Sequence, residues 1–385
     1  MKKLFAILLI VTVILSAFAA CSPDNEKDPS EKTISFGVLA PLTGTNAEYG
    51  KGFKIAAQMA ADEINAKGGV NGYKIDLVVK DSKGDAKESA DLARQFADSK
   101  SIMGIVGDFS SSCCMANAPI VDEAHLVQIS PTASNPTYAS MSPYCFSIMG
   151  RQDGEAPFFS TYLLKKYLGA SNIGVIWINS DWGKAAHDNF LKQAAVDGLK
   201  IVADVNYVQD EKDFSSAISK LRAANPDTIL IMNQGAVPTI INQVAQAGWK
   251  NVRITTLGPG TSQQILDLCG DNANGVITST PFFFDPTDQR KVEWEKAFKE
   301  KAGFAPTVHP ACAYDCVYML AEAVKNINTD EITRENIRDQ LQNLEYDGFT
   351  GPIKFNKDGD ITRKYLIIEV KDGKYVKQTD FDYAQ

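Results

Sequence analysis

The fold is decided by residues 102–134, which read IMGIVGDFSSSCCMANAPIVDEAHLVQISPTAS. Two short apolar runs, Ile102–Val106 and Leu126–Ile129, have the length and composition of buried strands. The residues between them, near Ser112–Glu123, form a helix-like stretch. A strand, a helix and a second strand in this order predict parallel neighbours in one sheet, with the helix packed on a face.

A loop rich in hydroxyl groups follows each of these strands at once. The loops are Gly107–Ser112 (GDFSSS) and Ser130–Ser134 (SPTAS). Unpaired backbone amides at a helix start lie at the positive end of the helix dipole, so with Ser and Thr hydroxyls they can bind a carboxylate without Lys or Arg. Serines also cap helices without any ligand, and for one loop alone that interpretation is the stronger one. Two such loops after consecutive strands favour a ligand site, because ligands of open α/β sheets bind beyond the carboxyl ends of strands.

The same alternation of strand and helix continues along the chain. Further strands are predicted at Ile34–Ala40, Tyr73–Lys80, Ile173–Ile178, Lys200–Tyr207, Thr228–Met232, Arg253–Leu257 and Gly275–Thr280. Further helices are predicted at Phe53–Ile64, Asp85–Asp98, Glu155–Leu168, Gly183–Asp197, Phe214–Ala224, Thr239–Ala247, Ser262–Cys269, 287–302, 309–325 and 333–343, with a strand-like tail at Phe349–Phe355, Lys364–Val370 and Lys374–Lys377. This order predicts an α/β protein with parallel sheets covered by helices on both faces. Nine strands before the tail fit two sheets better than one.

The first residues have the layout of a secretory signal. Met1–Ala20 begins with two lysines, continues with an apolar run and ends in small residues. The apolar run is short for a membrane span of about 20 residues, and no later segment approaches that length. We therefore expect residues 1–20 to be a signal peptide and the mature protein to be extracytoplasmic.

The signal ends in Phe-Ala-Ala-Cys, which resembles a bacterial lipoprotein box. In such proteins the cysteine, here Cys21, is lipidated and becomes the mature N-terminus. The alternative is a plain secretory signal with a chance cysteine. Residues 21–32 are polar, contain two prolines and lack core-forming side chains, so they are predicted to be a flexible tether between a lipid anchor and the folded part.

Composition and charge narrow the function. The chain has 385 residues, of which 44% are hydrophobic and 22% charged, as expected of a globular protein with two domains. Its net charge of −8 becomes −10 once residues 1–20, with their two lysines, are removed. An acidic chain of this kind argues against nucleic acid as a partner, and against membrane binding through charge.

Cysteine and histidine patterns give no strong metal or disulfide signal. The six cysteines after Cys21 allow many pairings, among which the sequence does not choose: Cys113, Cys114, Cys145, Cys269, Cys312 and Cys316. A faint H-x2-C-x3-C pattern at residues 309–316 matches no standard zinc spacing. We expect buried thiols that act as small apolar side chains, with no metal and no cofactor.

Catalytic motifs are missing from the sequence. It contains no Walker loop, no G-x-G-x-x-G after a strand, no G-x-S-x-G and no H-E-x-x-H. A hydrolase using Ser111 would need a base within hydrogen-bond reach, and none can be identified among three scattered histidines. We therefore expect a binding protein and not an enzyme.

Several stretches together resemble one known family. The chain is similar to the branched-chain amino acid binding proteins of bacterial ABC importers over roughly residues 33–370. Each matching stretch is weak alone, but their order and spacing are specific. They are Gly37–Gly50, Ala60–Gly72, Gly107–Ser112, Ile129–Pro136, Asp181–Gly183, Glu211–Leu221, Ala313–Ala323 and Gly351–Asp360.

The resemblance implies the type I periplasmic-binding fold: two Rossmann-like α/β lobes with parallel sheets, joined by three hinge crossovers and closing on a ligand like a trap. Lobe 1 would hold residues 33–149 and 282–345, and lobe 2 residues 150–281 and 346–385. The crossovers would lie near Ile148–Arg151, Thr280–Phe283 and Asp347–Phe355.

The resemblance also implies a set of ligand-binding residues. Ser110 and Ser111 match the segment that holds the ligand carboxylate, and Thr132 and Ser134 match positions that bind carboxylate and ammonium. Tyr49 matches a lobe 1 aromatic residue at the cleft. Trp182 stands where the family often has Tyr or Phe; Asp181 and Gly183 beside it predict a turn that exposes the indole to the cleft. Gln234 is expected to contact the ligand from lobe 2, with Asn233 nearly as good a match.

The sequence departs from the family at one position. Where amino acid binders of the family carry a Glu that pairs with the ligand ammonium, this chain has Gly260, within Gly258–Thr261. An unpaired buried ammonium costs several kcal/mol. Either another acid supplies the charge, with Asp285 or Asp108 as candidates, or the ligand has no amine. The apolar run Pro281–Phe284 is either a wall for the ligand tail or a packed hinge.

The resemblance predicts a lipid-anchored solute-binding protein that captures a small amino acid, most simply a branched-chain one, and delivers it to ABC permease subunits. One alternative is a binder of an amine-free carboxylate or amide. Another is a ligand-sensing module of a signalling receptor, because fold alone does not fix function.

Overall fold

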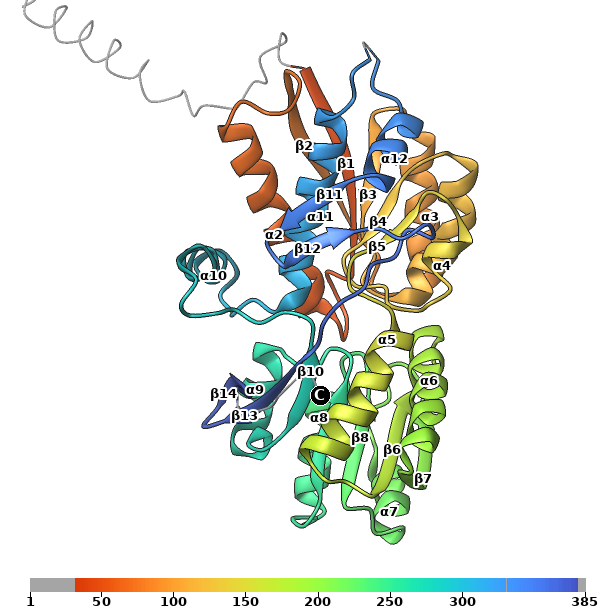
Figure 1. The fold of residues 1–385 in the computed structure, drawn as a ribbon, viewed down its shortest axis with the longest axis vertical. Helices are drawn as coiled ribbons and strands as arrows, with labels where there is room; N and C mark the ends of the chain where they lie inside the picture. The colour runs from red at the N-terminus through yellow and green to blue at the C-terminus, as the bar shows by residue number, and fades with distance from the viewer. Residues whose placement is uncertain (1–31, 330, 380–385) are drawn as a thin grey trace, which may run out of the picture. The chain divides into compact units, whose positions relative to one another are not determined.

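Two sheets, each covered by helices, organise the protein (Figure 1). The computed structural model describes residues 32–329 and 331–379. The predicted signal peptide, Cys21 and all but the last residue of the predicted tether lie outside the described residues. From Ile34 onward the described chain belongs to one compact unit.

The first sheet has the strand order β2-β1-β3-β4-β5. β3 pairs in parallel with β1 and β4, and β4 with β5. The strands are β1 (Lys32–Ala40), β2 (Tyr73–Asp81), β3 (Ile102–Val106), β4 (Gln128–Ser130) and β5 (Cys145–Ser147). The helices that pack with them are α2 (Ala47–Ala66), α3 (Ala86–Asp98), α4 (Ser111–Glu123), α10 (Gln289–Ala302), α11 (Val308–Lys325) and α12 (Arg334–Gln342).

Strand β1 is buried on both faces, as expected for a parallel sheet between two helix layers. Phe36 and Val38 point to a core shared with α2 and α11, whereas Leu39 points to a smaller core with α3 and α4. This alternation follows from the two-residue period of a strand. The predicted parallel, doubly covered sheet is therefore confirmed for the first half of the chain.

The second sheet has the order β14-β13-β10-β9-β8-β6-β7. Its strands are β6 (Asn172–Ile178), β7 (Lys200–Tyr207), β8 (Thr228–Met232), β9 (Arg253–Leu257), β10 (Ile277–Thr280), β13 (Leu366–Lys371) and β14 (Lys374–Lys377). The first five pair in parallel, while β13 and β14 add an antiparallel edge. The covering helices are α5 (Gln152–Pro157), the π-helix η2 (Phe158–Tyr167), α6 (Asp181–Asp197), α7 (Ser215–Ala223), α8 (Val237–Gln246), α9 (Gln263–Cys269) and the 3-10 helix η3 (Gly270–Ala273).

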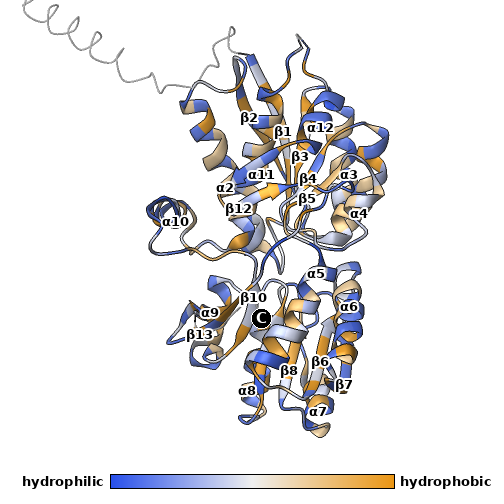
Figure 2. Ribbon diagram, viewed as in Figure 1, coloured by the Kyte–Doolittle hydropathy of each residue, from blue (hydrophilic) through white to orange (hydrophobic). Residues whose placement is uncertain are grey.

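Hydropathy separates buried strands from exposed helices. In the second half β6 and β8 are strongly hydrophobic, whereas α10, which packs on α2 of the first half, is largely hydrophilic (Figure 2). All five residues of β8 are buried, because it lies in the middle of the sheet with helices on both sides. Among the described residues, no helix combines the length and apolarity needed to cross a membrane.

Three segments connect the two sheets. The chain leaves the first sheet after β5 and enters the second with α5; it returns between β10 and α10. The third crossover was predicted at Asp347–Phe355, and this is wrong. The hairpin of β11 (Glu345–Gly348) and β12 (Gly351–Lys354) packs in the first half, because Phe349, Ile353, Phe355 and Ile361 belong to the first core. The third crossover therefore lies between Ile361 and β13, and lobe 1 extends about 15 residues beyond the predicted boundary at 345.

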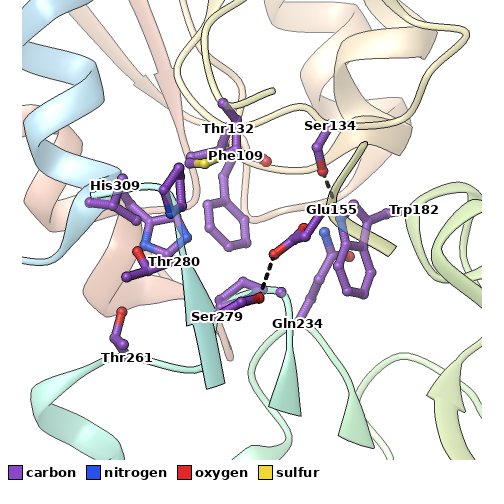
Figure 3. A pocket seen from close by; sticks show the side chains of 15 residues that line it. Phe109, Thr132, Ser134, Glu155, Trp182, Gln234, Thr261, Ser279, Thr280 and His309 are labelled. Atoms are coloured by element: carbon purple, nitrogen blue, oxygen red, sulfur yellow. Dashed lines mark hydrogen bonds between the residues drawn. The ribbon is translucent and has the colours of Figure 1, made fainter. Parts of the chain in front are cut away.

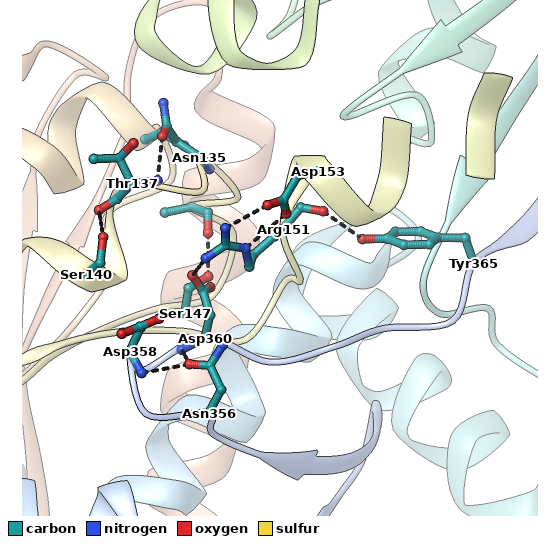
Figure 4. A network of polar contacts seen from close by, with 12 residues as sticks. Asn135, Thr137, Ser140, Ser147, Arg151, Asp153, Asn356, Asp358, Asp360 and Tyr365 are labelled. Carbon is teal, nitrogen blue, oxygen red and sulfur yellow. Dashed lines mark hydrogen bonds and ion pairs between the residues drawn. The ribbon is translucent and has the colours of Figure 1, made fainter. Parts of the chain in front are cut away.

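A polar network ties the first crossover to the third (Figure 4). Arg151 pairs with Asp153 and lies 3.6 Å from the buried carboxylate of Asp360. Arg363 donates to the carbonyl oxygens of Ile148 and Thr350. Burial raises the pKa of Asp360 to about 7, although Arg151 acts in the opposite direction. The hinge is thus fixed by directed hydrogen bonds as well as by apolar packing.

Candidate functional site

A cavity lies between the two lobes, beyond the carboxyl ends of their strands (Figure 3). The space between its walls measures about 490 Å³, part of it open to solvent. Lobe 1 and the first crossover contribute Phe109, Thr132, Ser134, Met149, Val308 and His309. Lobe 2 and the second crossover contribute Glu155, Trp182, Gln234, Gly258, Pro259, Thr261, Ser279, Thr280 and Pro281.

The first hydroxyl-rich loop lies just behind the cavity wall. Phe109 lines the cavity, whereas Ser110 and Ser111 are buried and lie outside its lining. Ser110 is the N-cap residue of α4, but no hydrogen bond from its side chain caps the helix. The hydroxyl of Ser111 accepts from the backbone N–H of Asn135 at 3.3 Å. The loop therefore brings the helix start close to the cavity, with Phe109 as its contact with the interior.

The second hydroxyl-rich loop lines the cavity directly. Thr132 and Ser134 are both buried and both belong to the lining. The hydroxyl of Thr132 donates to the carbonyl of Phe109 at 2.8 Å, which joins the two loops. The two loops that the sequence singled out thus meet at one edge of the first sheet.

Trp182 lines the opposite wall, but the turn predicted for it is wrong. It lies in the first turn of α6 and not on a loop, because Ser180 caps that helix by accepting from the N–H of Gly183 at 3.1 Å. Trp182 is also almost fully buried, with 3% of its surface exposed. Its indole N–H donates to Ser134 Oγ at 3.0 Å, so it reaches across the cavity to lobe 1.

Tyr49 supports the wall of the cavity without belonging to its lining. Its ring stacks on Phe109 with centroids 4.9 Å apart, and its hydroxyl donates to the carbonyl of Pro259 at 3.3 Å. Gln234 does line the cavity, whereas the alternative Asn233 is fully buried and accepts from the N–H of Gly235. The structure thus brings Thr132, Ser134, Trp182 and Gln234 around one space, with Tyr49, Ser110 and Ser111 behind them.

The carboxylate in this cavity is one that sequence reasoning missed. Glu155 in α5 is buried, lines the cavity and accepts a hydrogen bond from Ser279 Oγ at 3.0 Å. Burial raises its pKa to about 7, an effect that the Ser279 hydrogen bond opposes. A signal was available, because Glu155 begins the predicted helix that directly follows the first predicted crossover.

The two acids proposed from sequence lie elsewhere. Asp108 is fully buried and accepts from Ser89 Oγ and from the N–H of Phe109. Asp285 is bound by the N–H and hydroxyl of Thr287 and lies outside the cavity lining. Neither candidate for the ammonium partner therefore belongs to the lining of this cavity.

The surroundings of Gly260 leave little room for a side chain at the position where the family carries its Glu. A Cβ at Gly260 would come within 2.1 Å of Thr256 Oγ1 and 2.3 Å of Thr278 Oγ1. Contacts that short do not occur, so either the two threonine side chains or the backbone would have to shift. Position 260 is therefore unfavourable for any residue with a Cβ, a carboxylate-bearing one included.

The phenylalanines of Pro281–Phe284 pack chiefly as a hinge. Pro281 lines the cavity, but Phe282 and Phe284 meet edge to face, and both rings contact Phe349 in the β11–β12 hairpin of lobe 1. Phe284 also stacks on Trp294. Apart from Pro281, the apolar run thus packs at the crossover and does not line this cavity.

Histidine and cysteine side chains here do not form a metal centre. In residues 32–329 and 331–379, no cluster of three or more His, Cys, Asp or Glu could hold a metal ion. His309 lines the cavity, and burial lowers its pKa to about 3, so it is neutral. All six described cysteines are buried free thiols.

Two α/β lobes with a cavity between their strand ends define a solute-binding protein of the hinged, two-lobed class. The family model described as periplasmic binding protein matches residues 33–374. The chain therefore belongs to the periplasmic binding protein family, and the resemblance found in its sequence is confirmed.

Individual relatives agree with this assignment. The chain is 29% identical over 333 residues to the Leu/Ile/Val-binding protein homolog 1 of Brucella abortus, covering 85% of this chain and 87% of that protein. It is 28% identical over 352 residues to the amino acid binding protein of Pseudomonas aeruginosa, covering 89% and 91%. The crystal structure of the branched-chain amino acid transporter substrate binding protein LivJ from Streptococcus pneumoniae, in complex with isoleucine, superimposes with a TM-score of 0.82 at 24% identity, covering 90% and 100%.

Proposed function

We propose that this protein captures a small amino acid, with branched-chain side chains as the first candidates, and delivers it to an ABC permease. The observation that carries the proposal is the cavity wall itself. Hydroxyl-bearing Thr132 and Ser134 come from one lobe, and Trp182 and Gln234 come from the other. Closing the lobes therefore assembles the site, which is the expected action of a hinged binding protein.

The cavity has the character of a site for a small polar solute with an apolar part. Phe109, Met149 and Val308 provide apolar surface, while a few hydroxyl and amide groups provide directed hydrogen bonds. Such a mixture is typical of small-molecule sites. The names of the Brucella and Pseudomonas relatives, and the isoleucine in LivJ, support an amino acid as the solute.

Binding without chemistry is part of the proposal. Ser111, the candidate nucleophile, is hydrogen-bonded by the N–H of Asn135, and within the described residues no histidine is its hydrogen-bond partner. A serine without a base in reach is not an effective nucleophile. The site is therefore assigned to recognition and release.

The proposed location is the outer side of the cytoplasmic membrane, with a lipid on Cys21 as the anchor. Family membership supports an extracytoplasmic place, and the anchor rests on the Phe-Ala-Ala-Cys sequence. Expression of the wild type and of Cys21→Ser tests the anchor. The wild type should sediment with membranes and carry a lipid mass on its N-terminal peptide, whereas Cys21→Ser should be released.

Calorimetric titration of the purified mature protein tests the binding function. The panel is L-leucine, L-isoleucine, L-valine, other amino acids, aliphatic amides and small organic acids. Binding of at least one amino acid is expected, and Gln234→Ala should weaken it about tenfold because it removes a hydrogen-bonding group from the lining. Gln246→Ala, at the exposed end of α8, is the matched control and should leave binding unchanged. An absence of binding to every solute would contradict the proposal.

A further inference from the structure

We propose that Glu155 is the counter-ion for the ammonium group of the bound solute, so that the cavity selects zwitterionic α-amino acids over amine-free acids and amides. This inference rests on the proposed function and names the substrate class of the same site. It assigns to α5 a charge that the family pattern places at the end of β9, where this chain has Gly260.

Glu155 reaches the cavity from the lobe 2 side. It lies in the short helix α5 directly after the first crossover, and its carboxylate points into the middle of the cavity, between Phe109 and Trp182 (Figure 3). Ser279 Oγ donates to one carboxylate oxygen at 3.0 Å and so fixes its direction. The carboxylate is therefore directed at the space that a solute would occupy.

The charge of the cavity lining comes from Glu155. Glu155 is the one acidic residue of the lining, and none of the described lining residues is Lys or Arg. His309 is neutral because of its burial. Ionised Glu155 therefore gives the site a single negative charge that no protein group of the lining neutralises.

The negative charge of Glu155 is energetically costly while the cavity holds no cation. A buried carboxylate without a cationic partner is strongly unfavourable, and in the described chain no basic side chain forms an ion pair with Glu155. An ammonium group at hydrogen-bond distance would neutralise the charge, while the faces of Phe109 and Trp182 would favour a cation beside them. An amine-free acid would bring a second negative charge into the same space.

The opposite end of the solute has its own place. Thr132 and Ser134, with the backbone of their loop, line the lobe 1 side of the cavity and carry no charge. The Ser134 hydroxyl accepts from the Trp182 indole and keeps its own proton to donate to a carboxylate. The Thr132 hydroxyl, in contrast, donates to the Phe109 carbonyl. A zwitterion bound between the lobes would thus place its carboxylate toward lobe 1 and its ammonium toward Glu155 of lobe 2.

The experiment compares L-isoleucine and L-leucine with 4-methylpentanoate, which has the leucine skeleton without the amine. Titrations use the wild type, Glu155→Gln and Glu155→Asp. Glu300→Gln, an exposed carboxylate in α10, is the matched control. We expect Glu155→Gln to bind the amino acids about 30-fold more weakly or worse, since removing one member of a buried charge pair is costly. Its affinity for 4-methylpentanoate should stay the same or rise, and Glu300→Gln should match the wild type.

A second readout uses the wild type alone and does not depend on the folding of any variant. Calorimetry in two buffers of different ionisation enthalpy counts the protons released on binding. Glu155 is partly protonated near pH 7, so an arriving ammonium should release about half a proton per site at pH 7. The other titratable groups that face Glu155 are His309, which is already neutral, and Tyr365, whose pKa burial raises well above its usual value.

The outcomes separate the two proposals. Tight binding of amino acids with proton release, lost in Glu155→Gln, supports the assignment. Unchanged amino acid binding by Glu155→Gln, the absence of proton release, or a wild type that prefers 4-methylpentanoate overturns it, while solute binding itself stands. A wild type that binds none of these solutes overturns the proposed function and this inference with it.

Discussion

The indole N–H of Trp182 donates a hydrogen bond to the hydroxyl of Ser134 over 3.0 Å, and the two residues belong to different lobes. Nearby, the side-chain amide of Asn135 donates to the carbonyl of Asp181 at 2.9 Å. Across the cleft, Gln264 N–H donates to the carboxylate of Glu48, also at 2.9 Å. The lobes are therefore held together on both sides of the cavity by few, directed contacts that a hinge motion can break and remake.

Removing the indole N–H of Trp182 should weaken the contact between the closed lobes, while an aromatic ring still fills this part of the cavity wall. Trp182→Phe keeps an aromatic ring but cannot donate to Ser134, so we expect solute affinity to fall about two- to tenfold, the equivalent of one hydrogen bond. Calorimetric titration measures the change. Trp177→Phe is the control, because its indole N–H bonds to Asp204 within lobe 2, away from the cavity. Equal losses in both variants would contradict a role for Trp182 in closure.

Replacing Gly260 by alanine should destabilise the protein by about 1–3 kcal/mol, the usual cost of overpacking. The added Cβ would collide with the hydroxyls of Thr256 and Thr278. Thermal and urea unfolding measure the free energy. Gly154→Ala offers the comparison, since a Cβ there meets nothing within 4 Å, and it should be neutral. A Gly260→Ala protein as stable as the wild type would show that the strand end has room for a side chain.

Arg334 should contribute more to the stability of lobe 1 than an exposed arginine does. Its guanidinium donates to the carbonyl oxygens of Phe96, Ala97, Ser99, Ile102 and Ala124. Arg334→Ala leaves these oxygens unsatisfied in a partly buried place, so a loss of about 2–4 kcal/mol in unfolding free energy is expected. Arg94→Ala, which breaks only an exposed ion pair with Asp91, should change it by less than about 0.5 kcal/mol. Similar effects of the two substitutions would refute this ranking.

Glu155 should lower the stability of the ligand-free protein as the pH rises. Its pKa is about 7 in the folded protein, above its ordinary value of 4.5, so the folded state binds more protons between these values. Stability from this group is therefore full below pH 4.5 and is lost as the pH rises through 7. Glu155→Gln should be more stable than the wild type at pH 8, by up to about 3 kcal/mol, and equal to it near pH 4.

Unfolding curves of both proteins at several pH values check this prediction. The difference between them isolates Glu155, because Asp360, whose pKa is also raised to about 7, is present in both. A difference that does not vary with pH would mean that Glu155 titrates normally.

The elements with strong local signals could be predicted from the sequence. β8 and β9 have the predicted bounds, Thr228–Met232 and Arg253–Leu257, because each is a short apolar or β-branched run between turn residues. β5 was missed, because its three residues, Cys145–Ser147, are too short to show any period. The third crossover was misplaced, because the tail strands look alike in sequence and only tertiary packing assigns Phe349 and Ile353 to lobe 1.

Part of the site could also be predicted from the sequence, because some of its residues directly follow a recognisable strand. Thr132 and Ser134 follow a strand and so had to lie at the ligand edge of a sheet. Asp181 and Gly183 beside Trp182 predict a turn, but these residues form the first turn of a helix that Ser180 caps. Glu155 and His309 were missed as cavity residues, because no local pattern shows which helix end faces the opposite lobe.

In the proposed complex one solute lies between Thr132 and Ser134 on one side and Glu155 on the other. A crystal structure of the protein with L-isoleucine, or with the solute that copurifies with it, tests this most directly. We expect the solute carboxylate at the Thr132–Ser134 loop and its ammonium nitrogen within hydrogen-bond distance of the Glu155 carboxylate. A solute held elsewhere, or one whose amine points away from Glu155, would contradict it.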